Sequence, residues 1–112
     1  MALHHALSGE IIDLATTPAD APQNQSTALL RTAEVEVIRR VLQKDQEVAE
    51  HQVNGPVIFH CLNGAVRLIR PGASAAVLLR SAQMSWLAGG EPYALTAQED
   101  SVLLMTIVRR PE

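Results

Sequence analysis

The chain contains four histidines, one cysteine and one tyrosine, which are among the side chains through which it could bind a metal ion or transfer protons. Neutral imidazole is a common metal ligand, and its pKa of about 6.5 also suits it as a general base. No Cys-x-x-Cys motif or Cys/His cluster predicts a structural zinc site, and the single Cys61 cannot form a disulfide within the chain. His4 and His5 lie near the N-terminus, where we expect them to be solvated.

Composition narrows the classes of protein to which the chain can belong. Its 112 residues predict one domain, and hydrophobic residues at 47% with aromatic residues at 3% predict an aliphatic core. The net charge is −3, and no basic run is longer than Arg39-Arg40 or Arg109-Arg110, so we expect no nucleic-acid partner. Residues 1–14 contain neither a basic leader nor a long apolar stretch, which predicts a cytoplasmic protein without a membrane span.

The strands that would position these side chains begin after an N-terminal region whose composition differs from that of the rest of the chain. Residues 16–26 are polar and contain Pro18 and Pro22, which is typical of a linker or long loop. Ahead of them Ile11, Ile12 and Leu14 form a short apolar patch that needs a cover, as in an N-terminal strand or arm. We therefore divide the chain into an arm and linker over residues 1–30 and a folded domain over residues 31–112.

Short strands follow one another through this domain. Residues 56–62 and 65–70 flank Asn63-Gly64, a strong hairpin signal because both turn residues tolerate positive φ. Further strands are predicted over residues 76–80, 84–87, 93–96 and 101–108. Residues 34–42 fit both a strand and one face of a helix, and their β-branched residues favour the strand. Such spacing predicts an all-β sandwich or barrel, and a helix over residues 34–50 is the alternative.

The last predicted strand is apolar on both faces. Val102, Leu104 and Val108 alternate with Leu103, Met105 and Ile107. A strand of this kind needs cover on each side, from a second sheet or from a partner subunit. We predict a homodimer, with a fully covered monomer core as the alternative.

Two motifs make the chain resemble the cupin superfamily over about residues 34–109. The first motif, G-x5-H-x-H-x3-E-x6-G, corresponds to residues 45–64: His51 and Gly64 match, whereas Asp45, Val53 and Val57 replace the first glycine, the second histidine and the glutamate. The second motif, G-x5-P-x-G-x2-H-x3-N, corresponds to residues 82–97, where Gly90 matches and Ala82, Ala88, Tyr93 and Ala97 replace the other residues. The resemblance is to small single-domain cupins of bacteria, and it implies an antiparallel double-stranded β-helix, a jelly-roll-like barrel with little helix.

The same resemblance implies a degenerate metal site. Cupins that bind iron, manganese or nickel use two or three histidines and a carboxylate that face into the barrel. Of these positions only His51 keeps a metal-binding side chain. We expect no metal cofactor, with a divalent metal bound through His51 as the alternative. His60 is expected on the opposite face of its strand, away from the lumen.

The resemblance also implies that the lumen is lined by His51, Phe59, Cys61 and Tyr93. Trp86 or Met84 is expected to join them, depending on which side chains of their strand point into the barrel. These residues predict an apolar pocket for a small apolar or carboxylated molecule, which is the first hypothesis for function. The alternative is an enzyme. It would be a metal-dependent dioxygenase or isomerase with non-standard ligands, or a metal-free isomerase with His51 and Tyr93 as base and acid.

Overall fold

The computed structural model describes residues 5–14, 26–73 and 75–109, and the regular structure in them is entirely β-strand. The strands are β1 (Ser26–Arg31), β2 (Val35–Leu42), β3 (Glu47–His51), β4 (Val57–Asn63), β5 (Ala65–Ile69), β6 (Val77–Arg80), β7 (Gln83–Leu87), β8 (Tyr93–Ala97) and β9 (Ser101–Val108). The predicted all-β fold is confirmed, and the helical alternative over residues 34–50 is wrong, because β2 and β3 occupy most of that segment. No helix long and apolar enough to cross a membrane occurs in the described part of the chain.

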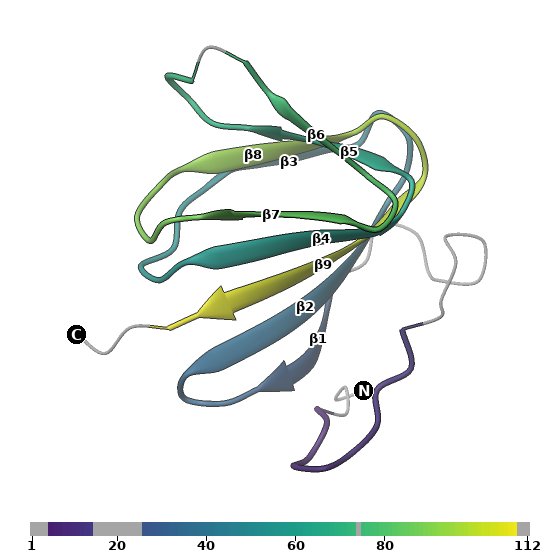
Figure 1. The fold of residues 1–112 in the computed structure, drawn as a ribbon, viewed down its shortest axis with the longest axis vertical. Helices are drawn as coiled ribbons and strands as arrows, with labels where there is room; N and C mark the ends of the chain where they lie inside the picture. Colours follow the sequence, from purple (N-terminus) through teal and green to yellow (C-terminus); the bar gives the residue numbers. More distant parts are fainter. Residues whose placement is uncertain (1–4, 15–25, 74, 110–112) are drawn as a thin grey trace.

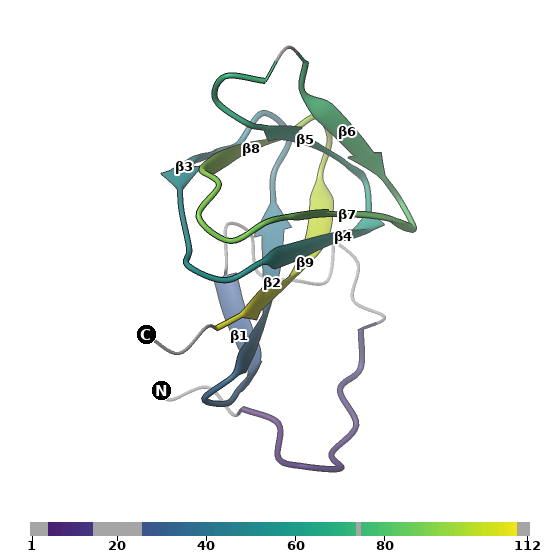
Figure 2. The same cartoon turned by 60° about the vertical axis from the view of Figure 1, so that its left-hand side comes forward.

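The strands form two antiparallel sheets that face each other. A five-stranded sheet has the order β1-β2-β9-β4-β7, and a four-stranded sheet has the order β3-β8-β5-β6 (Figure 1). Figure 2 shows the two sheets as opposite walls of one barrel. Side chains from alternate strand positions fill the space between them: Leu42, Val57, Phe59, Cys61, Val66, Leu68, Leu79, Leu87, Tyr93, Leu95, Ala97, Leu103 and Met105. The core is thus largely aliphatic, as the composition predicts.

The Asn63-Gly64 turn joins β4 to β5 and packs tightly against the start of β9. Gly64 has a φ of +95°, and a side chain there would overlap the Ser101 hydroxyl and the Asp100 carbonyl. The Ser101 hydroxyl is buried, accepts a hydrogen bond from the Ala65 N–H at 3.1 Å and donates one to the Glu99 carbonyl at 2.7 Å. The predicted hairpin is therefore fastened to a third strand by one buried serine.

The four glycine positions of the two cupin motifs share one backbone conformation. Gly64 and Gly90 have φ of +95° and +87°, and the replacing residues Asp45 and Ala82 have φ of 70° and 67°. Among the described residues, Asp45 and Ala82 are the non-glycine residues with positive φ. All four turns have the positive φ that a glycine allows, although Asp45 and Ala82 stand at two of the positions.

Replacing Ala82 with glycine is expected to stabilise the protein by about 0.5–1 kcal/mol. An alanine in the left-handed region costs about 1–2 kcal/mol, and the greater freedom of glycine in the unfolded chain offsets part of the gain. The Ala82 N–H donates to the Cys61 carbonyl at 2.8 Å, so the turn between β6 and β7 keeps its geometry. Urea unfolding of the Ala82→Gly variant should show a higher midpoint, and the dependence of the unfolding free energy on urea should be unchanged. A lower midpoint would contradict the inferred backbone strain at Ala82.

Two strands of the structure, β1 and β3, were not predicted. β1 begins at Ser26, pairs with β2 and spans the expected boundary between the arm and the domain at residues 30 and 31. β3 is an edge strand with mostly exposed side chains, which pairs with β8 through an irregular register. Residues 5–14 form no strand, and the expected linker over residues 16–26 lies outside the described residues except for Ser26, which begins β1.

Candidate functional site

An open pocket lies at one end of the barrel, and we call it the mouth pocket. Its volume is about 520 Å³, within the range of small-molecule sites. The inner face of β2, the end of β9 and the β3–β4 loop supply the lining residues, which are Glu36, Ile38, His51, Gln52, Val53, Asn54, Gly55, Ile107 and Arg109. The pocket therefore combines an apolar floor of aliphatic side chains with a charged and polar rim.

Close backbone packing holds the wall of the mouth pocket. A side chain on Gly55 would overlap the carbonyl of Val108, and one on Gly89 would overlap the carbonyl of Asn54. The Gly90 N–H donates to the Val53 carbonyl at 2.8 Å, and the Val108 N–H donates to the Pro56 carbonyl at 2.9 Å. The β3–β4 loop is thus held between the β7–β8 loop and the end of β9, which fixes one side of the pocket.

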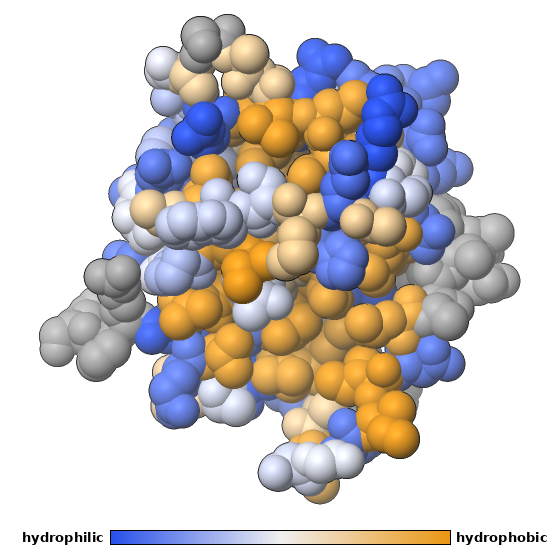
Figure 3. All heavy atoms as spheres, in the orientation of Figure 1, coloured by the Kyte–Doolittle hydropathy of each residue, from blue (hydrophilic) through white to orange (hydrophobic). Residues whose placement is uncertain are grey.

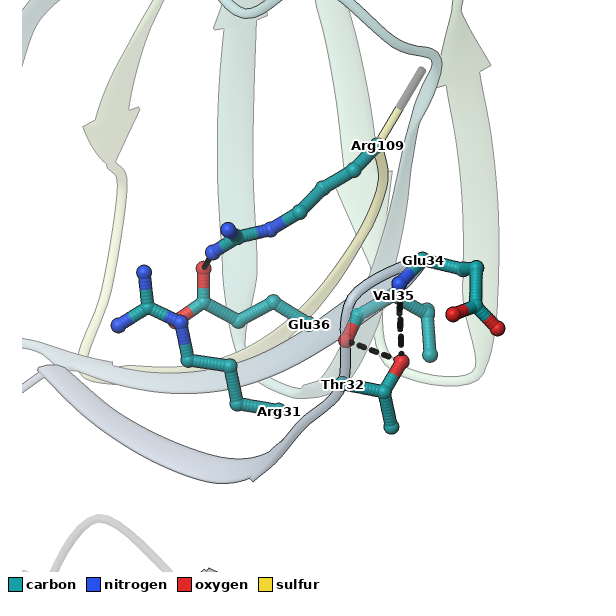
Figure 4. A network of polar contacts seen from close by, with 6 residues as sticks. All are labelled: Arg31, Thr32, Glu34, Val35, Glu36 and Arg109. Atoms are coloured by element: carbon teal, nitrogen blue, oxygen red, sulfur yellow. Dashed lines mark hydrogen bonds and ion pairs between the residues drawn. The ribbon is translucent and has the colours of Figure 1, made fainter. Parts of the chain in front are cut away.

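A second part of the rim contains Glu36, whose carboxylate lies beside two guanidinium groups (Figure 4). Arg109 Nη2 lies 3.0 Å from Glu36 Oε1, and Arg31 Nε lies 3.8 Å from Glu36 Oε2. The Arg109 N–H donates to the Glu34 carbonyl at 2.7 Å, and the Thr32 hydroxyl accepts hydrogen bonds from the Glu34 and Val35 N–H groups. The Glu36 carboxylate is thus paired with both guanidinium groups.

Three of the predicted site residues meet near the mouth. The rings of His51 and Tyr93 are 6.0 Å apart and edge-to-face, and those of Phe59 and Tyr93 are 5.0 Å apart. His51 is exposed at the rim of the pocket, whereas Tyr93 and Phe59 are buried in the core below it. Burial raises the pKa of the Tyr93 phenol above its usual value of 10.0, although the Arg40 guanidinium opposes the rise. The phenol therefore keeps its proton at neutral pH.

Cys61 lies deeper along β4, toward the end of the barrel away from the mouth. It is fully buried, and its Sγ is 3.4 Å from the Asn63 carbonyl oxygen. Burial, together with the negative charge of Glu99, raises the pKa of the thiol. Cys61 contributes an apolar side chain to the core and does not line the mouth pocket.

Trp86 and Met84 point away from the lumen, so placing Trp86 in the lumen pocket is wrong. Trp86 pairs with Ile58 and is 62% exposed, and Met84 pairs with His60 and is 61% exposed. The alternation along β4 explains this, because Val57, Phe59 and Cys61 are buried and the residues between them face outward. His60 is half-buried on this outer face, opposite Leu104.

The side chains at the cupin metal positions do not fit a divalent ion. Val53 and Val57 offer no donor atom, which leaves the imidazole of His51 and the protonated phenol of Tyr93. Glu36 shares the pocket with His51 but is engaged by Arg31 and Arg109. Over residues 5–14, 26–73 and 75–109, no three His, Cys, Asp or Glu side chains come together as metal ligands would.

Sequence reasoning missed three charged residues of the inner face: Glu36, Arg40 and Arg109. Arg40 pairs with Leu103, which pairs with Cys61, so its side chain shares the inner face with these two core residues. Its Nε is buried and has no hydrogen-bond partner among the described residues. The sequence signal that could have identified Glu36 and Arg40 is their spacing, because together with Ile38 they share one face of the predicted strand.

The fold and the pocket define a small antiparallel β-barrel with an open end, and known structures share it. No family profile and no curated protein sequence matches the chain. A cupin superfamily protein from Desulfitobacterium hafniense is similar with a TM-score of 0.77 at 15% identity, covering 98% of this chain and 100% of that one. A conserved protein of unknown function from Streptococcus pyogenes is similar with a TM-score of 0.76 at 18% identity, covering 100% of both chains. Part of a salicylate 1,2-dioxygenase from Pseudaminobacter salicylatoxidans is similar with a TM-score of 0.61 at 19% identity, covering 66% of this chain and 21% of that one.

These similarities and the all-strand structure identify the fold as that of a small cupin. The two turn glycines that match the motifs, Gly64 and Gly90, agree with it, and so do Asp45 and Ala82 at the other two positions, because all four have positive φ. The metal-binding positions of the motifs are largely replaced. The chain therefore has the fold of a small cupin but lacks most of the metal-ligating residue types of the two motifs.

Proposed function

We propose that the protein binds a small carboxylated molecule with an apolar body in the mouth pocket. The observation that carries the proposal is the composition of the pocket: Ile38, Val53 and Ile107 offer an apolar surface beside the guanidinium of Arg109. Ligand sites typically combine such a surface with a few polar groups that orient the ligand. Because Glu36 is also paired with Arg31, it neutralises Arg109 only in part, and the Arg109 guanidinium can attract an anion.

His51 supplies the second polar contact in this proposal. Its imidazole is exposed at the rim, and its edge-to-face contact with Tyr93 sets the direction of the ring. A ring nitrogen donating to a ligand carboxylate would form a charge-assisted hydrogen bond, which is about twice as strong as a neutral one. Arg109 and His51 would then hold the acidic group while the aliphatic residues contact the apolar body.

Nuclear magnetic resonance titration with benzoate and with its neutral amide, benzamide, tests the proposal. We expect benzoate to shift the amide signals of Ile38, Val53 and Ile107 and to bind about tenfold more tightly than benzamide. The His51→Gln variant should lose about tenfold in benzoate affinity, and the matched control His5→Gln should keep it, because His5 lies outside the pocket. Shifts confined to Trp86 and Ile58, or equal affinity for the two probes, would contradict the proposal.

A second candidate is a metal-free isomerase that uses His51 and Tyr93. The observation in its favour is the contact between the two rings, which places a base beside a protonated phenol. Tyr93 is only 2% exposed, however, so a substrate would have to enter below the rim to reach it. A Tyr93→Phe variant separates the candidates: benzoate binding should persist, whereas an acid–base enzyme would lose its activity.

We also propose that the protein acts without a resident metal, since the side chains at the motif positions do not suit one. Elemental mass spectrometry of tag-free protein, dialysed against a weak chelator, tests this directly. A metal content near one ion per chain would overturn the proposal and direct attention to a metal-dependent reaction around His51.

A further inference from the structure

One charged side chain of the five-stranded sheet faces inward, and the proposed function does not yet use it. Figure 3 shows apolar residues gathered over β4, β9 and β2 on the face that it draws, and Trp86 of β7 is exposed. Arg40 of β2 has the opposite arrangement, because it pairs with Leu103 and shares the inner face with that fully buried residue. Removing a guanidinium from water costs free energy unless an acceptor replaces the water. Packing alone therefore does not account for Arg40.

Arg40 has no acceptor within the described part of the chain. Its Nε is buried and has no hydrogen-bond partner there. No ion pair to Arg40 occurs among the described residues either, although Arg31 and Arg109 both have one. Glu36, the acidic residue on the same face of β2, is already paired with those two guanidinium groups. The Arg40 guanidinium can thus donate to an anion that enters the barrel.

The barrel is least sealed on the side where Arg40 lies. Inward-facing residues of β4, β5 and β8 are fully buried. Ile38 of β2 and Val48 of β3 also pack against the core, yet both keep partial exposure, and so does Arg40. Ile38 lines the mouth pocket, and Arg40 is the next inward-facing residue of β2. The mouth pocket therefore leads along β2 toward the guanidinium.

The inner face of β2 presents its side chains in a specific order. Glu36 lies at the rim with Arg109 Nη2 3.0 Å from its Oε1, Ile38 follows, and Arg40 comes last. Glu36 and Arg40 are four residues apart, which is about 13 Å along a strand. The two guanidinium groups thus belong to opposite ends of an apolar stretch. A linear molecule with an acidic group at each end and methylene groups between them matches this order.

The Tyr93 phenol provides a further donor near Arg40. Burial raises the pKa of this phenol and the Arg40 guanidinium lowers it, so the two groups lie within electrostatic reach of each other. Tyr93 also pairs with His51 of β3, and their ring centres are 6.0 Å apart. His51, Tyr93 and Arg40 together carry polar groups from the rim of the mouth pocket into the interior.

We propose that the barrel holds an inner anion site at Arg40, and that the ligand is a linear dicarboxylate whose inner carboxylate accepts hydrogen bonds from Arg40 and Tyr93. This inference rests on the proposed function, because the outer carboxylate is the one that Arg109 and His51 hold at the mouth pocket. A carboxylate accepts two parallel hydrogen bonds from a guanidinium, and these are short and charge-assisted. The inner carboxylate supplies the acceptor that Arg40 lacks and neutralises its charge.

Adipate and hexanoate test the proposal, because they have chains of the same length and differ in one terminal acid group. Isothermal titration calorimetry at neutral pH should show adipate binding about tenfold or more tightly than hexanoate. The Arg40→Gln variant should lose this preference and keep its affinity for benzoate. Arg67→Gln is the matched control and should keep the preference, since Arg67 is exposed between two buried residues of β5 and faces away from the barrel interior.

A magnetic resonance signal reports on the contact itself. The enclosed Nε–H of Arg40 should exchange slowly with water and give a resolved side-chain signal, which Arg40→Lys removes and thereby assigns. Adipate should shift this signal, whereas benzoate at the mouth should leave it nearly unchanged. Arg40→Gln should fold, because it removes a charge that has no protein partner. The signal in the original protein keeps the test decisive if that variant does not fold.

Several results would overturn the inner anion site. They are equal binding of adipate and hexanoate, an Arg40 Nε–H signal that adipate does not shift, and an adipate preference that survives Arg40→Gln. Equal losses in Arg40→Gln and Arg67→Gln would mean that adipate responds only to overall charge. If benzoate still binds at the mouth pocket in these cases, the proposed function stands without the inner site. If benzoate, hexanoate and adipate all fail to bind, both proposals are wrong.

Discussion

Replacing Gly55 with alanine is expected to destabilise the fold by about 3 kcal/mol or more. The added carbon would overlap the carbonyl of Val108, a backbone group that cannot rotate away as a side chain can. Either the β3–β4 loop or the end of β9 must move. The end of β9 leads into Arg109, so the same change is expected to displace the guanidinium from Glu36 and to weaken benzoate binding at the mouth pocket.

Urea unfolding at fixed protein concentration measures the loss, and Gly72→Ala is the matched control. Gly72 has a φ of +86°, but a side chain there meets nothing within 4 Å. Its replacement should therefore cost only about 0.5–1 kcal/mol, which is the left-handed backbone penalty less the freedom that alanine removes from the unfolded chain. Equal losses in the two variants would show that the overlap at Gly55 is relieved by a small shift, contrary to our expectation.

Phe59→Ala is expected to lower the free energy of unfolding by about 3–5 kcal/mol. The sequence placed Phe59 in a ligand pocket, but the structure buries it completely against Tyr93, with ring centres 5.0 Å apart. Removing the ring deletes buried apolar surface and leaves a cavity between the sheets, since Met105 and Tyr93 are held by their own strands. The expected effect is therefore mainly on stability.

The Phe59→Leu variant is the control for this role. Leucine retains most of the buried volume, so the loss should be about 1 kcal/mol, and benzoate affinity should stay close to that of the original protein. Thermal or urea unfolding gives the first quantity, and the magnetic resonance titration gives the second. A stable Phe59→Ala protein that no longer binds benzoate would instead assign Phe59 to the ligand site.

Much of the fold could be predicted because it rests on local signals. The hairpin around Asn63-Gly64 and the strand over residues 101–108 follow from turn chemistry and from apolar runs, and the structure contains both. β1 and β3 escaped prediction for a physical reason. Both are edge strands, and few of their side chains are buried, so their sequences carry little of the alternation that marks a strand.

The candidate site was less predictable than the fold. The motif positions identified His51 and Tyr93, and the structure brings their rings into contact. The remaining members of the mouth pocket depend on how strands distant in sequence meet. Glu36 and Arg109 are 73 residues apart and become neighbours only because β2 pairs with β9 along its whole length.

The sequence by itself determined most of the strands, the aliphatic core and the Asn63-Gly64 turn, because each depends on residues close together in the chain. The tertiary structure decided which face of each strand is buried, and so it placed Trp86 outside the barrel and Phe59 and Cys61 in its core. It also decided where the barrel stays open and which charges meet there. The reason is that the buried face of a strand depends on the register in which it pairs with its neighbours. A shift of that register by one residue would exchange the two faces of the strand.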